Sequence, residues 1–254
     1  MSLIAFGLMV LAALAAGFIN AIAGGGTLVT FPVLVALGLP PVSANVTNTI
    51  ALLPGYLGGT LAQRDDMRAQ ARRLFLLVPL GALGGLGGGL LLIASGDRLF
   101  AAVVPWLILA ASLLLAIQPA LRSLLVRRAA SSGQAGVHPA WSVAPLVAAS
   151  VYGGYFGAGL SVIVLAALGL GSDESLTRLN ALKQAFSFVV NLAAAVFFAF
   201  SGKVMWLEAG VMAVAALAGG WIGGFFAGRL KPSILRWTVV AIGTIIGFVY
   251  LFRG

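Results

Sequence analysis

Long apolar runs alternate with short polar or glycine- and proline-rich breaks, and this pattern predicts ten helical segments. At about 1.5 Å of rise per residue, a helix needs about 20 apolar residues to cross the hydrocarbon core of a bilayer. Two segments, 27–38 and 160–171, have only about 12 residues and are too short to cross it, so we expect broken or re-entrant helices there. The predicted segments are 3–22, 27–38, 44–62, 74–95, 99–118, 141–154, 160–171, 177–200, 204–227 and 234–252.

Composition decides what surrounds these helices. Of the 254 residues, 61% are hydrophobic and only 8% are charged, whereas a soluble domain carries about 25% charged residues. The surface must therefore be apolar, and we predict an all-α polytopic membrane protein whose surroundings are the lipid bilayer. The net charge of +9 would suggest nucleic acid in a soluble protein. In a membrane protein short basic loops set the orientation, so we expect no nucleic-acid partner.

The ten segments form two similar sets of five. A glycine-rich tip, 24–26 or 157–159, precedes each short segment, and Asn48-Thr49-Ile50 is matched by Asn180-Ala181-Leu182. Glycines four residues apart in both fourth segments favour close helix packing; they are Gly81, Gly85, Gly89, Gly220, Gly224 and Gly228. The predicted domains are a first repeat at 1–118, a basic cytoplasmic linker at 119–140 and a second repeat at 141–254.

Basic residues cluster in three loops, 63–73, 119–140 and 228–236. Cytoplasmic loops carry an excess of Lys and Arg, so all three loops are predicted to be cytoplasmic and both termini to lie outside. Five segments per half, an odd number, then require two inverted repeats. Folds of this kind place the substrate site near the bilayer midplane, between the halves.

The two glycine tips are the first candidates for binding. A helix that begins after such a tip presents unpaired N–H groups and a partial positive charge, and glycine lets a ligand approach closely. We therefore predict two facing cradles for an anion, although close helix packing alone would also explain the glycines. The candidate residues are Gly24, Gly25, Gly26, Thr27, Gly157 and Gly159.

Polar side chains in the third segment of each half are the second candidates. Asn180, Gln184, Ser187 and Asn191 share one helix face, and Lys183 lies one residue off it. Polar groups in spans usually face the bundle interior or a cavity; the alternatives are interhelical hydrogen bonding for the amides and snorkelling for the lysine. We predict that Lys183 supplies a fixed positive charge for the substrate. The full set of predicted substrate contacts here is Asn45, Asn48, Thr49, Asn180, Lys183 and Gln184.

The acidic residues all map to loops or span ends; they are Asp65, Asp66, Asp97, Asp173, Glu174 and Glu208. Proton relays and sodium sites commonly use an intramembrane carboxylate, so the pattern argues against a cation transporter. Backbone carbonyls could still hold a sodium ion. The chain has no cysteine and no hydrolase or nucleotide-binding motif. We accordingly expect no enzyme activity, no catalytic residue, no metal site and no cofactor.

The chain resembles the TauE/SafE sulfite-exporter family over nearly its whole length. The first half carries GFINAIAGGGTLVTFP at 17–32 and ANVTNTIALLPG at 44–55. The second half carries GGYFGAG at 153–159, LNALKQ at 179–184 and FSGKVMW at 200–206. The resemblance implies a bacterial inner-membrane permease with two related halves. It also implies a sulfur-containing anion as substrate, such as sulfite, thiosulfate, taurine or another organosulfonate.

Together the patterns favour a secondary transporter that moves a small anion by alternating access. An anion-selective channel is one alternative, because no coupling residue is evident. A membrane scaffold without a solute is another. The sequence leaves open the identity of the anion, the direction of transport and the oligomeric state, including a homo-oligomer.

Overall fold

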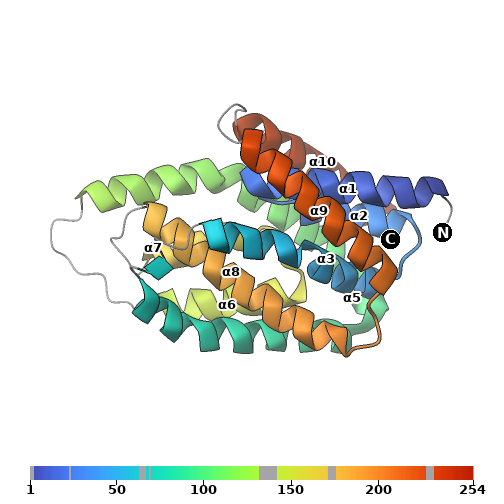
Figure 1. The fold of residues 1–254 in the computed structure, drawn as a ribbon, viewed down its shortest axis with the longest axis horizontal. Helices are drawn as coiled ribbons and strands as arrows, with labels where there is room; N and C mark the ends of the chain where they lie inside the picture. The colour runs from blue at the N-terminus through green and yellow to red at the C-terminus, as the bar shows by residue number, and fades with distance from the viewer. Residues whose placement is uncertain are drawn as a thin grey trace.

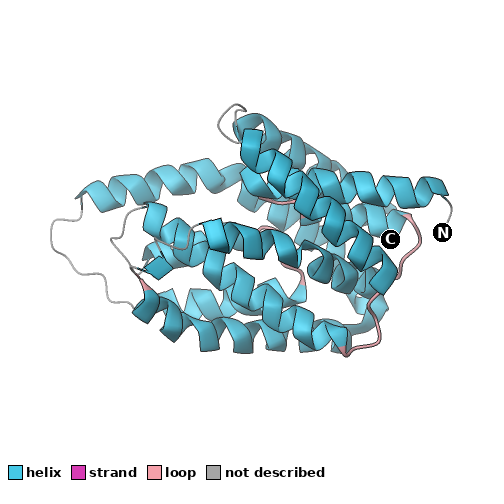
Figure 2. Ribbon diagram, viewed as in Figure 1, coloured by secondary structure: helices cyan, strands magenta, loops and turns pink. Residues whose placement is uncertain are grey.

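A computed structural model describes residues 3–22, 24–62, 67–68, 70–131, 142–170, 176–226 and 232–253. All secondary structure in these ranges is helical (Figure 2), so the predicted all-α membrane fold is confirmed. The helices are α1 (Leu3–Ile22), α2 (Thr27–Ala36), α3 (Pro41–Ala62), α5 (Ala71–Ser131), α6 (Val143–Tyr155), α7 (Leu160–Leu170), α8 (Leu176–Ala199), α9 (Trp206–Phe226) and α10 (Pro232–Arg253). They lie roughly along one long axis of the molecule (Figure 1).

Helix α5 contains the predicted fourth and fifth segments as two arms. Gly96 separates the arms with φ 65° and ψ 175°, a conformation that favours glycine. The second arm continues beyond the predicted end at 118 to Ser131, so the first part of the predicted linker 119–140 is helical. Apolar positions such as Leu121 and Leu125, which pack on the core, extend the buried face through the basic residues. The rest of that linker lies outside the described residues.

The distribution of side chains fits a lipid environment. Within the described ranges five helices are long and apolar enough to cross a membrane, and they lie at Leu3–Ala21, Ala71–Arg127, Arg178–Ala199, Trp206–Gly223 and Ser233–Phe252. All four described tryptophans are more than half exposed on the outer surface. By contrast, Asn45, Thr47 and Asn48 of α3 are at most 1% exposed. The molecule is therefore apolar outside and partly polar inside, as expected for a protein that surrounds a polar site with lipid-facing helices.

Packing between the two halves is reciprocal. Helix α1 packs on α9, and its counterpart α6 packs on the first arm of α5. A Cβ at Gly17 would lie 2.0 Å from the Ala216 carbonyl oxygen, and one at Gly88 would lie 2.0 Å from the Val151 carbonyl oxygen. Both contacts are backbone against backbone, which only glycine permits. Two related halves would produce this exchange of equivalent contacts.

Equivalent helices also approach from opposite ends. The Thr60 hydroxyl, near the end of α3, lies 3.5 Å from the carbonyl oxygen of Gln184, near the start of α8. Helix α1 begins at the end of the molecule where both termini lie, whereas α6 begins at the opposite end (Figure 1). These directions support inverted repeats. The inverted repeat and its orientation relative to the cytoplasm stay predictions.

The predicted packing role of the fourth-segment glycines holds for the first arm of α5. A Cβ at Gly85 would lie 2.4 Å from the Val190 carbonyl oxygen of α8, and one at Gly81 would lie 3.1 Å from the Phe186 ring. Gly220 is less close, since its Cβ would lie 3.7 Å from the nearest atom. Gly228 lies outside the described residues.

Substitution at two adjacent glycines of α5 should separate packing from helix propensity. Gly88→Val is expected to reduce the yield of folded protein and its unfolding temperature, since overpacking costs about 1–3 kcal/mol or more where backbone must move. Gly87→Val is the matched control, because nothing lies within 4 Å of a Cβ there. Size-exclusion profiles and thermal unfolding in detergent measure both. Equal unfolding temperatures for the two variants would contradict the close α5–α6 contact.

Candidate functional site

Two glycine tips reverse the chain inside the molecule. The first joins α1 to α2 and the second joins α6 to α7. Gly24 and Gly25 have φ of 83° and 95°, and Gly157 and Gly159 have φ of 79° and 73°. Other residue types adopt this left-handed region only with strain. The glycines are thus required for the reversals themselves, independently of any ligand.

The two tips lie against each other. A Cβ at Gly24 would be 3.5 Å from the Ser161 hydroxyl oxygen in the first turn of α7. Both tips also touch the second arm of α5: Gly25 lies against Leu115, and Gly159 lies against Ala111, one helical turn away. The predicted meeting of the tips within the protein is therefore observed.

Each tip leaves backbone N–H groups for a ligand. At the first tip Gly26 N–H is not available, because it donates to Asn20 Oδ1 at 2.7 Å. The N–H groups of Gly25 and Thr27 have no hydrogen-bond acceptor among the described residues. The same holds, within the described chain, for Ala158 and Gly159 at the second tip. These donors are the unpaired N–H groups that any helix start presents.

Thr30 connects the first tip to α3. Its hydroxyl lies 2.5 Å from Asn48 Oδ1 and 3.2 Å from the Gly26 carbonyl oxygen. Because the Asn48 amide oxygen accepts the hydrogen bond from Thr30, the Nδ2 group of Asn48 is the part of the amide that can donate to another partner. The Thr49 hydroxyl instead donates to the Asn45 carbonyl oxygen of its own helix at 2.9 Å. Of the two predicted donors, only Asn48 keeps a hydrogen-bond donor for another partner.

Asn45 connects α3 to the second tip. Its Nδ2 donates to the Tyr155 carbonyl oxygen at 2.9 Å, and the residue is 1% exposed. The amide oxygen, Oδ1, has no donor among the described residues. The available group of Asn45 is therefore an acceptor, which does not suit an anion.

The predicted residues of α8 lie away from the tips. Lys183 Nζ donates to Asn180 Oδ1 at 3.0 Å. Lys183 precedes Asn191, whose Oδ1 faces Gly157 of the second tip, by eight residues, or about 12 Å of helix. Lys183 and the neutral side chains of Asn180 and Gln184 thus form a separate polar group toward the end of the molecule where α8 begins.

Asn191 of α8 lies beside the second tip, although the sequence analysis did not include it among the predicted substrate contacts. Its Oδ1 lies 3.7 Å from where a Cβ on Gly157 would be. The residue belongs to the polar face predicted for this helix, so its position on that face was a usable signal. The local sequence similarity of Asn180 to Asn48 selected a different turn of the helix from the one that lies by the second tip, and the role of Asn180 stays a prediction.

The sequence analysis also did not predict an aromatic cluster at the second tip, because it selected candidate residues by glycine and by polar side chains. Phe156 packs edge-to-face on Phe31 and Phe100, with ring centroids 5.4 and 6.1 Å apart. The Tyr155 hydroxyl lies 3.3 Å from the Ser95 hydroxyl, beside the Gly96 turn. The cluster therefore fills the space between the tips and the Gly96 end of the bundle.

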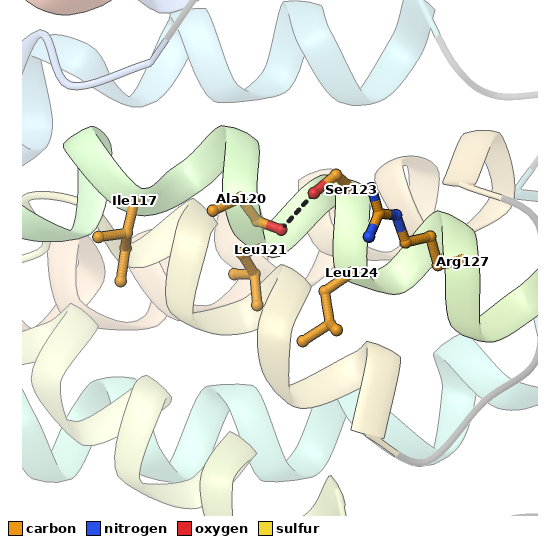
Figure 3. Close-up of a pocket in the computed structure, with 6 residues that line it drawn as sticks. All are labelled: Ile117, Ala120, Leu121, Ser123, Leu124 and Arg127. Carbon is orange, nitrogen blue, oxygen red and sulfur yellow. Dashed lines mark hydrogen bonds between the residues drawn. The ribbon is translucent and has the colours of Figure 1, made fainter.

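A hollow of about 410 Å³ lies elsewhere, along the second arm of α5 (Figure 3). It is lined by Ile117, Ala120, Leu121, Ser123, Leu124 and Arg127. All six residues come from one helix, and the Ser123 hydroxyl donates to the Ala120 carbonyl oxygen at 2.8 Å. This hollow contains no glycine tip and none of the predicted contacts, so the candidate site stays at the tips.

The family model described as Sulfite exporter TauE/SafE matches residues 9–250. The chain belongs to the TauE/SafE family. The TauE/SafE match includes both tips and all the helices that cover them, so the broken-helix arrangement lies wholly within the family region.

Curated relatives of this TauE/SafE chain are transporters by name. A probable membrane transporter protein of Haemophilus influenzae is 28% identical, over 89% of this chain and 86% of its own length. The probable membrane transporter protein ORF9 of a Sinorhizobium species is 27% identical, over 91% and 86%. The probable membrane transporter protein YfcA of Escherichia coli is 24% identical, over 97% and 89%. No solved structure matches the chain. The protein is a multi-pass transporter of the bacterial inner membrane.

Asn20 offers a direct test of the first tip. Asn20→Ala is expected to lower the unfolding temperature in detergent, because a buried N–H left without an acceptor costs about 1–3 kcal/mol. Asn20→Asp keeps an acceptor oxygen for Gly26 and should recover part of the loss. If both variants unfolded at the wild-type temperature, the Asn20–Gly26 bond would not stabilise the tip.

Proposed function

We propose that this transporter carries a small sulfur-containing anion, such as sulfite, thiosulfate, taurine or another organosulfonate, by alternating access. The observation that carries the proposal is the meeting of two glycine tips inside the protein, each at the start of a short helix. A helix start carries a partial positive charge and unpaired N–H groups, which together bind anions. Two such starts at one place give an anionic guest donors from both halves.

The available donors match the chemistry of a sulfonate or sulfite group. Such a group has three oxygens around sulfur, and each accepts hydrogen bonds from a different direction. Gly25 and Thr27 supply N–H groups from the first tip, Ala158 and Gly159 supply them from the second, and Asn48 adds its Nδ2. Buried, charge-assisted hydrogen bonds of this kind are about twice as strong as neutral ones. We leave Asn45 out of this anion site, because its amide hydrogens already bind the Tyr155 carbonyl.

We assign Lys183 to the path by which the anion reaches the two glycine tips, and not to the anion site itself. Its Nζ, bound to Asn180 Oδ1, supplies a positive charge about 12 Å along α8 from Asn191 at the second tip. The Gln70 side chain donates to the Arg178 carbonyl oxygen at 3.0 Å, which places the start of α5 at this same end. A cationic group in this position attracts an anion toward the tips and raises its local concentration.

Several features favour a carrier over a channel. Reciprocal packing of α1 on α9 and of α6 on α5 supports two halves that can rock against each other. The aromatic cluster of Phe31, Phe100 and Phe156 is buried and lies between the tips and the Gly96 end of the bundle. A continuous pore would need this region to be open to water. Transport by this protein therefore requires a conformational change at the cluster.

Counterflow in proteoliposomes tests the function. Vesicles loaded with unlabelled sulfite should accumulate labelled sulfite transiently, because a carrier exchanges substrate across the membrane, whereas a pore only dissipates gradients. Thermal shifts with sulfite, thiosulfate, taurine, sulfoacetate and acetate then rank the anions. Stabilisation by none of them, together with absent counterflow, would favour a scaffold without a solute.

Lys183→Met should weaken anion binding more than about tenfold, or about 1.4 kcal/mol, because it removes the positive charge before the tips. Lys203→Met is the matched control, since Lys203 is exposed in the short connection between α8 and α9. Titrations of the thermal shift with the best anion measure both affinities. Wild-type affinity in a folded Lys183→Met protein would remove this lysine from the route.

A further inference from the structure

We propose that a sodium ion binds at the second tip, held by Asn45 Oδ1, Asn191 Oδ1 and main-chain carbonyls at the end of α6. The proposal assigns a coupling ion to the protein, and this part rests on the proposed transport function. Binding of the cation itself does not depend on which anion is carried. It concerns a place in the fold where the buried Asn45 Oδ1 has no donor among the described residues and where oxygens of α6 and α8 face the second tip.

Asn45 supplies the first of these acceptors. Its orientation is fixed, because only Nδ2 can donate to the Tyr155 carbonyl oxygen at 2.9 Å; a flipped amide would set two oxygens against each other. Oδ1 is therefore the atom left without a donor among the described residues, in a side chain that is 1% exposed. A buried acceptor without a partner costs about 1–3 kcal/mol, and a cation removes that cost.

The end of α6 supplies further oxygens. Gly157 N–H donates to the Tyr152 carbonyl oxygen at 3.2 Å, which leaves the Gly153 carbonyl without its regular helical donor. A Cβ at Gly157 would lie 3.1 Å from that Gly153 oxygen and 3.7 Å from Asn191 Oδ1. Two oxygens from different helices thus converge on the space that glycine leaves open. Carbonyls at the end of a broken helix carry a partial negative charge and coordinate cations in transporters.

The surrounding charges also favour a cation here. Asp97 Oδ1 accepts a hydrogen bond from Val42 N–H at 2.9 Å, one turn before Asn45 on α3. The nearest basic residue on the polar face of α8 is Lys183, eight residues before Asn191, or about 12 Å along the helix. The proposed cation site is therefore separated from the Lys183 charge along α8.

The ligands select a monovalent ion. Divalent calcium and magnesium sites use carboxylates, and no group of three or more acidic or histidine side chains occurs within the described part of the chain. Neutral amide and carbonyl oxygens at a broken helix suit sodium. A cation held beside the N–H donors of Ala158 and Gly159 would strengthen anion binding at the same tip by direct attraction.

Thermal unfolding without any substrate tests the site. Wild-type protein in detergent is compared in sodium, potassium and choline chloride at equal concentration, so that the anion is constant. Sodium is expected to raise the unfolding temperature by several degrees over choline, since a ligand that binds only the folded state stabilises it. Asn45→Leu should lose this rise. Thr49→Val should keep it, because the Thr49 hydroxyl donates to the Asn45 carbonyl oxygen within α3 and faces no proposed ligand.

Asn191→Leu is a second variant in case Asn45→Leu does not fold. Among the described residues the Asn191 amide donates within its own helix, to the Ser187 carbonyl oxygen at 2.8 Å, so its loss breaks no hydrogen bond between helices. Its sodium response should also fall. Equal unfolding temperatures of the wild type in sodium and choline would overturn the proposal, as would a full sodium response in both folded variants.

Anion uptake into proteoliposomes tests the coupling. An inward sodium gradient should raise the initial uptake rate over a choline gradient, and sodium should tighten anion binding in the thermal-shift titration at least about fivefold, the lower end of typical coupling between two sites. A sodium-dependent thermal shift without anion transport would keep the cation site and reject the proposed function. Transport that is equal in sodium and choline, with no thermal shift, would keep the function and reject the cation site.

Discussion

The structure depends on one constraint: a backbone polar group inside the bilayer must find a partner within the protein. Helices α1 and α6 both end at a glycine tip, where the chain turns into the short helices α2 and α7. Each reversal frees N–H and carbonyl groups that lipid would not tolerate. The neighbouring helices α3, α5 and α10 therefore cover the tips, and their polar side chains pair with some of the freed groups. What remains unpaired is the chemistry available for a solute.

Both tips follow this rule, but they use different partners. At the first tip the Asn20 side chain accepts a hydrogen bond from the Gly26 N–H, and the Thr30 hydroxyl connects the tip to Asn48. At the second tip the partners act on carbonyls: Asn45 donates to Tyr155, and the Tyr152 hydroxyl donates to the Ala158 carbonyl oxygen at 2.6 Å. The two halves thus keep the same backbone path while their side chains expose different groups. That difference would allow the second tip to offer acceptors to the proposed sodium ion in addition to the N–H donors that both tips would offer to the proposed anion.

The sequence predicted the helices well, because lipid makes hydropathy and glycine breaks strict signals. It failed at the end of α5, where the arginines suggested a loop although Leu121 and Leu125 continue the buried face. It located both tips from 24–26 and 157–159 alone. It could not orient the Asn45 amide, since the deciding carbonyl belongs to Tyr155, 110 residues away. Nor could it choose Asn191 over Asn180, because the turn of α8 that faces the tip depends on helix packing.

The second tip carries two opposite polarities within a few residues. The carbonyls that end α6 present partial negative charge, and the N–H groups that begin α7 present partial positive charge. Phe156 lies in the loop between the end of α6 and the start of α7, and its ring packs on Phe31 and Phe100. Opening the aromatic cluster must therefore move this loop, which carries both the carbonyls and the N–H groups. A cation on the carbonyls and an anion on the N–H groups would therefore respond to the same motion. Coupling in this fold can arise from the backbone of one short loop, without an intramembrane carboxylate.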